Sequence, residues 1–480
     1  MKEHFMLRRL FGDDVAENDA HLSEYFIETP AYRMALSGEK RFIIGRKGAG
    51  KSAICQQLQK QLPKAGALCI PLAPQRIQFT ALKLGLSDLS RWGNESDAVL
   101  QRVWYYGLLC ETAYALVRQS KREHDSEFAK IAAFVNKHYN YSEPNAFARL
   151  LKTTSLFLEQ LELGIGPLSV RRPGRAFDPI AVETELENLR VPLASFIARH
   201  LPQGVYILID NLDEGWDNSA EANAFVRGLL LAVYEICQPN IPVRLIVFFR
   251  ADMYDNVTRQ FQHVDKYRQF QEHIYWGRKE IIELVAQRLR VNLKIKKPMT
   301  DLHVWNVVFD GDDDRTNIPH YIIDRSLLRP REVLQFCRLA AEKAQQRGHP
   351  KITMEDIQDS EREYSRWKID DLCNEFLFAL PGLKENVLQR FLGGSARFTP
   401  PRLRTLLEDA LTDPRSVARQ EWLENLRHAD ELIQVLYNIG FLKSTSQGKH
   451  WQSAQDPDYN IALAEAFVVH PVFRSYLRIG

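Results

Sequence analysis

A glycine-rich segment is the first stretch of the sequence whose residue types and spacing indicate chemistry. Residues 45–52 read Gly-Arg-Lys-Gly-Ala-Gly-Lys-Ser and fit the pattern GxxxxGK[ST]. Glycines let the backbone turn tightly, so that its N–H groups and the N-terminus of a following helix point at phosphate oxygens. In this pattern Lys51 contacts the β- and γ-phosphates and Ser52 binds Mg²⁺. The backbone expected to cradle the phosphates is that of Gly45, Arg46, Lys47, Gly48, Ala49 and Gly50.

To bind phosphate, such a loop must connect a strand to a following helix. An apolar run over residues 41–44 precedes it, and a helical pattern over residues 52–62 follows. The alternative, an ordinary glycine-rich turn, is disfavoured by that order. The sequence therefore predicts an α/β nucleotide-binding core.

A second cluster of chemical groups follows the apolar run at residues 206–209. Asp210 stands at the tip of this expected strand, with Asp213 and Glu214 close behind. An acid in this position, called Walker B, holds Mg²⁺, often through water, and Asp213 or Glu214 could polarise the attacking water. The alternative is a solvated turn in which an aspartate caps a helix. Because no [NT]KxD motif follows the loop, ATP is favoured over GTP as the nucleotide.

The remaining elements predict how the core is extended. A second strand is expected over residues 67–72, two buried-type strands over 205–209 and 245–249, and a fifth strand over 273–276. Between the motifs, residues 82–201 read as a helical insert. Two strong helices, 278–293 and 330–347, suggest a lid, and Thr353 with Asp356 suggests a helix cap. Helices over 403–411 and 421–439, then a hairpin near residues 447–448, suggest a winged-helix-like domain. The expected domains are a core over 1–277, a helical lid over 278–368 and the winged-helix-like domain over 369–480.

Composition limits the class of protein. The chain has 480 residues, of which 45% are hydrophobic and 26% charged, as in ordinary globular proteins. Its net charge of +2 provides no strong field toward nucleic acid or membrane. Six widely spaced cysteines without a CxxC pair fit a reducing compartment. With no apolar stretch long enough to span a bilayer and no secretory signal, we expect a cytoplasmic protein without a membrane partner.

With these motifs placed, the chain resembles the STAND and AAA+ branch of P-loop ATPases, and in particular bacterial STAND-like ATPases that are often associated with defence. The shared pieces are Tyr25-Phe26-Ile27, the loop GRKGAGKSA, an acidic segment of the DxLDE kind followed by Gly215-Trp216, and Arg329-Pro330-Arg331-Glu332. The resemblance implies a parallel sheet of the ASCE, AAA+ or STAND-like type. It also brings Ala53 into the nucleotide-binding set.

The resemblance further implies roles for two arginines. Arg250 ends the strand after Walker B, where such ATPases sense the γ-phosphate; the alternative is an ion pair with Asp252 or a neighbour. Arg331, at the start of a lid helix, resembles a second sensor; the alternative is a surface salt bridge. One departure is Asn211, which stands where AAA+ proteins usually have glutamate. Either Asp213 and Glu214 take over, or turnover is slow and the protein is mainly a switch.

The functional expectation is an ATP-binding and ATP-hydrolysing switch with Mg²⁺ as cofactor. Kinship implies a homo-oligomer, a partner effector protein and a role in anti-phage defence. From their position between the sensor strand and the next strand, Arg259 and Arg268 are candidates for an arginine finger; the alternative, solvated helix charges, is favoured for each. One alternative is an ATP-gated DNA-binding module resembling origin initiators, and another is a scaffold with structural ATP. For the DNA alternative, the candidate phosphate contacts in the C-terminal domain are Arg402, Arg404, Arg415, Arg419, Lys443 and Lys449.

Overall fold

A five-stranded parallel sheet organises one of the two units into which the chain packs. This sheet unit comprises Glu28–Arg46 and Lys51–Ile274, and the helical unit comprises Met1–Ile27, Lys47–Gly50 and Tyr275–Gly480. The computed structural model describes residues 7–74, 96–119, 124–138, 148–149, 179–237, 242–259, 265–310, 317–412, 420–453, 455–456 and 459–479. The expected domain boundaries remain a prediction.

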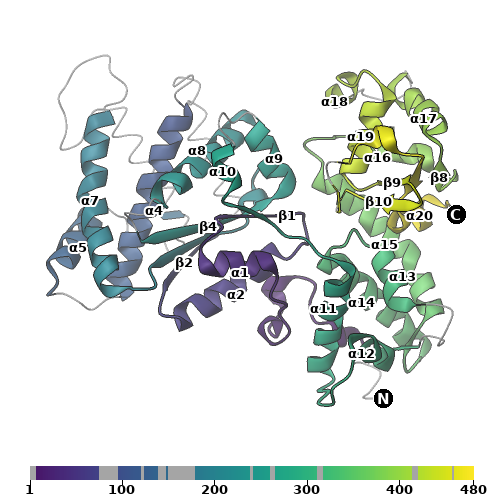
Figure 1. The fold of residues 1–480 in the computed structure, drawn as a ribbon, viewed down its shortest axis with the longest axis horizontal. Coiled ribbons are helices and arrows are strands. Elements are labelled where there is room, and N and C mark those ends of the chain that lie inside the picture. Colours follow the sequence, from purple (N-terminus) through teal and green to yellow (C-terminus); the bar gives the residue numbers. More distant parts are fainter. Residues whose placement is uncertain are drawn as a thin grey trace. The chain divides into compact units, whose positions relative to one another are not determined.

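The sheet has the order β2-β3-β4-β1-β5 (Figure 1). Its strands are β1 (Phe42–Gly45), β2 (Leu68–Leu72), β3 (Val205–Ile209), β4 (Val243–Arg250) and β5 (Gln271–His273). β4 therefore lies between the strands that precede the two motifs. The register pairs Gly45 with Arg250 and Ile209 with Val247, so the motifs end at the same edge of the sheet. The predicted strand over 273–276 is wrong in its bounds, because pairing with β1 ends at His273.

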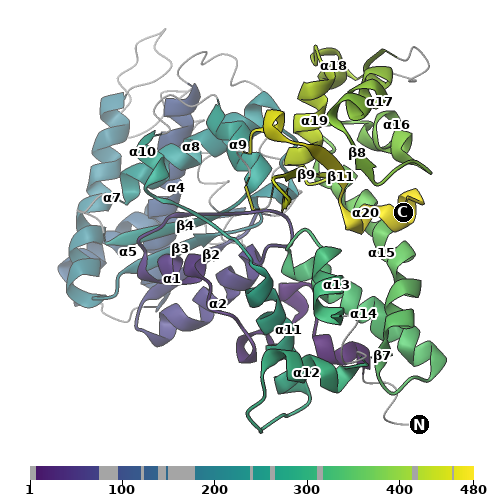
Figure 2. The ribbon, with the colours of Figure 1, turned by 45° about the vertical axis from the view of Figure 1, so that its right-hand side comes forward.

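Helices cover both faces of the sheet, as they must when every strand is parallel and buried. α1 (Pro30–Ser37) and α2 (Lys51–Lys64) lie on one face, and α8 (Ala220–Ile236) lies on the other with α4 (Ser96–Gln119) packed against it (Figures 1 and 2). The α4–α8 contact is close because Gly228 has no side chain: a Cβ there would come within 2.6 Å of the Leu100 Cβ. The other helices of the unit are α5 (Ser126–His138), α7 (Pro179–His200), α9 (Ala251–Arg259) and α10 (Asp265–Arg268).

The predicted helical insert over residues 82–201 is thus helical wherever the structure describes it as an element. Residues 164–175 of this insert, most of the acidic segment 310–315, and the candidate DNA contacts Arg415 and Arg419 lie outside the described residues. Within the part of the chain that is described, no helix has the length and apolar character needed to cross a bilayer.

The helical unit begins with short turns over the first 27 residues, η1 (Leu7–Phe11), η2 (Ala16–Asn18) and η3 (Leu22–Glu24). A buried ionic cluster attaches this N-terminal segment to α11 (Arg278–Asn292): Arg288 donates to Asp19 at 2.9 Å and to the Phe11 carbonyl at 2.8 Å. The Tyr25 hydroxyl donates to the same aspartate. The segment also contacts α14 (Pro330–Arg347), where Gln335 donates to Asp14 at 2.9 Å and Arg338 pairs with the same carboxylate.

The rest of the unit continues from these helices. α12 (Asp301–Val308), α13 (Ile318–Asp324) and α15 (Met354–Glu375) pack with α11 and α14, and β6 (Phe309–Asp310) pairs with β7 (Ile352–Thr353). The bounds of α14 agree with the predicted helix. The predicted cap is confirmed: the Thr353 hydroxyl accepts from the Asp356 N–H at 3.3 Å, and the Asp356 carboxylate accepts from the Thr353 N–H at 2.9 Å.

The C-terminal part adds helices and an antiparallel sheet of order β10-β9-β11-β8. The predicted turn is confirmed, with Gln447 and Gly448 both at positive φ. The predicted continuous helix over 421–439 is wrong, because α18 ends at Glu424 and α19 begins at Ala429; in the break between them the Arg427 N–H donates to the Glu431 side chain. The winged-helix assignment itself stays a prediction. The elements are α16 (Leu383–Asn386), η6 (Leu388–Phe391), β8 (Arg397–Phe398), α17 (Pro400–Thr412), α18 (Glu421–Glu424), α19 (Ala429–Asn438), β9 (Leu442–Ser446), β10 (Lys449–Trp451), η7 (Ile461–Leu463), β11 (Ala466–Val469) and α20 (Pro471–Leu477).

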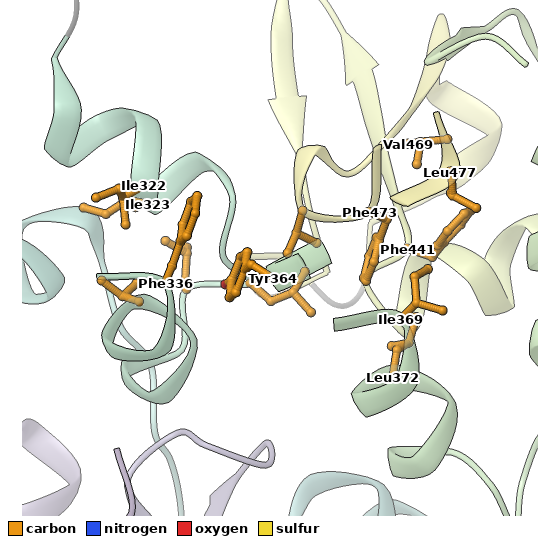
Figure 3. Close-up of a cluster of buried hydrophobic side chains, with 14 of the residues drawn as sticks. Ile322, Ile323, Phe336, Tyr364, Ile369, Leu372, Phe441, Val469, Phe473 and Leu477 are labelled. Atoms are coloured by element: carbon orange, nitrogen blue, oxygen red, sulfur yellow. The ribbon is translucent and has the colours of Figure 1, made fainter. Parts of the chain in front are cut away.

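α15 joins these parts through one apolar core. Near its middle Tyr364 stacks on Phe336 of α14 with ring centroids 4.3 Å apart, and toward its end Ile369 and Leu372 lie near Phe473 of α20 (Figure 3). Because a single buried cluster includes side chains from both the lid helices and the C-terminal elements, these regions pack as one body.

Candidate functional site

The glycine-rich loop between β1 and α2 has the backbone shape that phosphate binding requires. Gly48 and Gly50 have φ values of +79° and +98°, in the left-handed region where side chains are disfavoured. α2 begins at Lys51, directly after the loop. Backbone of alternating hand followed by a helix N-terminus forms a concave array of N–H groups, which is an anion site.

Lys51 and Ser52 lie in the sheet unit beside the first acid. The Lys51 ammonium donates to the carbonyls of Gly45 at 3.0 Å and Arg46 at 3.3 Å. Asp210, which follows β3, is 8% exposed. Burial raises the pKa of its carboxyl to about 6, although the Asn211 N–H, the charge of Lys51 and a hydrogen bond with Ser52 act in the opposite direction. The structure therefore brings the predicted lysine, serine and Walker B acid together.

This donor set fits Mg²⁺ held together with a nucleotide. A hydroxyl and a carboxylate are hard oxygen ligands, and Mg²⁺ usually takes only one or two protein ligands beside phosphate oxygens and water. The described residues contain no group of three or more His, Cys, Asp or Glu that could hold a metal by themselves. Ser52 and Asp210 would therefore hold the ion only in company with the phosphates.

Two acids, Asp213 and Asp252, lie beside Arg250 at the end of β4. Its guanidinium makes two contacts of 2.5 Å with Asp252 and lies 3.5 Å from Asp213. It also lies 5.6 Å from the centre of the Trp216 ring. The ion pair considered as the alternative for Arg250 is thus present, and it connects the arginine to one of the two candidate catalytic acids. Glu214 is exposed.

The chain reaches these acids through an unusual turn. Asn211 has φ +60° and leads into η5 (Leu212–Glu214). Asparagine tolerates this left-handed conformation better than most residues. The departure from the AAA+ pattern at Asn211 therefore coincides with a backbone requirement that the sequence pattern did not predict.

In the helical unit, the loop tip Lys47–Gly50 contacts residues near Trp276 and the start of α14. The Trp276 indole donates to the Ala49 carbonyl at 2.8 Å. The Arg331 N–H donates to the Gly48 carbonyl at 3.4 Å, and the Arg331 Nε donates to the Asp14 carbonyl at 3.3 Å. Arg331 therefore touches the loop through its backbone. Sequence reasoning missed Trp276 and also Arg329, whose only signal was its place in Arg-Pro-Arg-Glu.

The weaker candidates lie elsewhere. Arg259 and Arg268 are both exposed, which fits an arginine finger and a solvated charge equally. Among the candidate DNA contacts, Arg404 pairs with Asp430 at 2.7 Å and Lys449 is exposed. Lys443 is half-buried, and burial lowers its pKa to about 8.

Gly48 occupies a variable position of the motif, yet the structure leaves little room for a side chain. A Cβ there would lie 3.1 Å from the Arg331 Cβ and would also have an unfavourable φ. We expect Gly48→Ala to weaken ATP binding by about tenfold, since forcing a side chain into this conformation costs about 1–2 kcal/mol. Titration with a fluorescent ATP analogue measures this. Gly66→Ala is the matched control: Gly66 also has a positive φ, but a Cβ added there would have no neighbouring atom within 4 Å. Equal effects on binding would contradict the prediction.

Sheet order, loop and acid together define the fold: an α/β P-loop NTPase core of the ASCE type, with a helical insert, a helical lid and further C-terminal elements. Residues 279–373 match the family model described as the FunZ-associated C-terminal helical domain. The chain is 22% identical over 477 residues to the putative transposon gamma-delta 80.3 kDa protein of Escherichia coli K12. That alignment covers 96% of this chain and 66% of the relative, so the chain spans just under two thirds of that protein's length.

Several solved structures are similar over most of the chain, at low scores. The Aeropyrum pernix ORC2 protein, in its ADPNP-ADP complexes, is 13% identical with a TM-score of 0.41, covering 98% of this chain and 96% of that one. The A. pernix ORC1 protein in complex with DNA is 12% identical with a TM-score of 0.39 and the same coverage. Drosophila ORC bound to DNA has a TM-score of 0.35 at 12% identity, covering 99% and 90% of the two chains. The fold assignment rests on this chain's own sheet order and loop.

Proposed function

We propose that this protein binds ATP with Mg²⁺ and hydrolyses it, and that it acts as a nucleotide-dependent switch of the AAA+ or STAND kind. The observation that carries the proposal is the grouping of Lys51, Ser52 and the buried Asp210 at the edge of the sheet where the glycine-rich loop also ends. Bound Mg²⁺ would neutralise phosphate charge. The residues proposed to bind the nucleotide are Gly45, Arg46, Lys47, Gly48, Ala49, Gly50, Lys51, Ser52, Ala53 and Arg331.

The chain's own groups divide the work of phosphoryl transfer, which consists mainly of positioning and charge neutralisation. Lys51 would hold the terminal phosphates in place. Arg250 would sense the γ-phosphate, in exchange for part of its pairing with Asp213 and Asp252. Asp213 or Glu214 would accept a proton from the attacking water. Because Asp213 is paired with Arg250 and Glu214 is exposed, we propose that turnover is slow.

The two candidate bases can be separated by isosteric variants. We expect Asp213→Asn or Glu214→Gln, but not both, to lower kcat by about 100-fold, because removal of a general base typically has this effect. Phosphate release at saturating ATP measures kcat. Asp217→Asn serves as the control, because Asp217 is a half-buried acid three positions beyond the end of η5. If neither variant lowers kcat, these acids are not the base.

Further proposals concern the assembly of the protein and its partners. We propose that subunits associate, with Arg259 or Arg268 completing a neighbour's site, and that a partner effector and an anti-phage role follow from the sequence resemblance. A DNA-binding module is the second candidate, favoured by the exposed Lys449 beside the hairpin turn. A scaffold with structural ATP is the third.

One experiment tests these proposals together: ATP turnover against protein concentration, with and without duplex DNA, and with Lys51→Ala as the blank. Turnover per subunit that rises with protein concentration supports a site completed between subunits. Stimulation by DNA supports the second candidate. Turnover no higher than the blank contradicts hydrolysis by this chain, and ATP retained unhydrolysed through purification then favours the scaffold.

A further inference from the structure

Three successive carbonyl groups of the glycine-rich loop accept hydrogen bonds from the helical unit. Arg329 Nη1 donates to the Lys47 carbonyl at 3.3 Å, the Arg331 N–H to the Gly48 carbonyl at 3.4 Å, and the Trp276 indole to the Ala49 carbonyl at 2.8 Å. The loop residues concerned, Lys47–Gly50, pack with this unit although they interrupt a segment of the sheet unit. We call these donors the carbonyl clamp.

The clamp acts on the side of the loop that a phosphate does not touch. Each peptide unit is planar, with its N–H and C=O pointing in opposite directions. Fixing consecutive carbonyl groups therefore also fixes the directions of the N–H groups on the same peptide planes. An anion site whose donors are already oriented binds more tightly, because less conformational entropy is lost on binding.

The hydrogen bond to the Lys47 carbonyl also satisfies a donor of the buried Arg329 guanidinium. The side chain is 6% exposed, and its charge is paired with Glu375 at 2.7 Å, at the end of α15. Among the described residues, its Nε and Nη2 are buried without a hydrogen-bond partner. Loss of the Lys47 carbonyl would leave another donor of this buried group unsatisfied, which is costly. The loop tip therefore contacts a side chain that is itself buried and paired with Glu375.

We propose that Trp276 and Arg329 are positioning residues, which orient the phosphate-binding N–H groups through the carbonyl clamp and thereby raise the affinity for nucleotide. Neither side chain needs to touch the nucleotide. The consequence for affinity rests on the proposed ATP site, whereas the ordering of the loop does not.

Trp276→Phe tests the proposal, because it removes the indole donor and keeps most of the packing. Trp422→Phe is the matched control: the Trp422 indole is also half-buried and donates to a carbonyl, that of Pro381, at 2.8 Å. Two readouts are used: amide hydrogen exchange of the peptide spanning residues 45–52 in protein without nucleotide, and the KM and kcat for ATP.

We expect Trp276→Phe to speed exchange in the loop peptide and to raise KM about fivefold, the equivalent of one neutral hydrogen bond, with kcat nearly unchanged. Trp422→Phe should alter neither. Unchanged loop exchange in Trp276→Phe overturns the clamp, whether or not the wild type turns over ATP. Faster exchange with an unchanged KM overturns the role in affinity. Faster exchange in a protein whose wild type neither binds nor hydrolyses ATP overturns the proposed function and the role in affinity, and keeps the clamp as a structural brace.

Discussion

Lys51→Ala should strongly reduce ATP hydrolysis and weaken ATP binding, and this is the largest functional effect that we expect. The Lys51 ammonium lies at the glycine-rich loop and acts on the buried Asp210 as a positive charge. Loss of a charge-assisted contact weakens binding by roughly 10- to 100-fold, and loss of a preorganised donor to the transition state lowers kcat by roughly 10²–10³-fold. Isothermal titration gives the affinity, and phosphate release gives kcat.

Lys64→Ala is the control for this variant. Lys64 is the exposed last residue of the same helix, α2, so its removal changes net charge and helix composition in the same way. Lys51→Arg adds a second comparison, because it keeps the charge but changes the shape of the donor. An alanine variant at Lys51 that hydrolyses ATP at the wild-type rate would refute the proposed site.

Asp19→Ala should destabilise the helical unit by about 3–5 kcal/mol, because it leaves the charge of Arg288 buried without its partner. Asp19 and Arg288 are 7% and 6% exposed, and the guanidinium also donates to the carbonyls of Phe11 and Asp13. The free energy of unfolding can be measured by urea denaturation. The first 27 residues should at the same time become more sensitive to protease, since this cluster attaches them to α11.

Asp430→Ala provides the matched surface control. Asp430 pairs with Arg404 at 2.7 Å, but the side chains are 53% and 43% exposed. Exposed pairs of this kind contribute only about 0–1 kcal/mol. If Asp19→Ala and Asp430→Ala lower the free energy of unfolding by the same amount, burial does not determine the strength of the Asp19–Arg288 pair. Asp19→Asn should fall between the two, because the amide keeps a hydrogen-bond acceptor without the charge.

Local signals explain what the sequence could predict. β3 is an uninterrupted run of apolar and aromatic residues. A strand that is covered on both faces requires such a run, so its bounds could be predicted and agree with the structure. α14 begins at Pro330 and ends before Gly348, two residues that mark helix ends in sequence as well as in structure. The glycine-rich loop and Asp210 were found because their chemistry requires fixed residue types at fixed distances from strands.

The missed features depend on contacts between distant parts of the chain. Trp276 and Ala49 are 227 positions apart, and no local pattern marks an indole that donates to a loop carbonyl. Lys443 was considered as a DNA contact because its charge is visible in the sequence, whereas its half-buried position is not. The predicted helix over 421–439 is interrupted between Glu424 and Ala429, where the Arg427 N–H donates to the Glu431 side chain instead of to a helix carbonyl.

The docking of the N-terminal segment has a consequence for biosynthesis. Asp14 finds its partner Arg338 only 324 positions later in the chain. At typical ribosomal rates of 5–20 residues per second, that interval lasts roughly 16–65 s. For most of it, until α11 and then α14 have been synthesised, Leu10 and Phe11, which are buried in the finished protein, lack the helix surfaces that cover them. The nascent chain therefore presents an apolar N-terminal segment for chaperones to protect, and the helical unit is completed only after the sheet unit has left the ribosome.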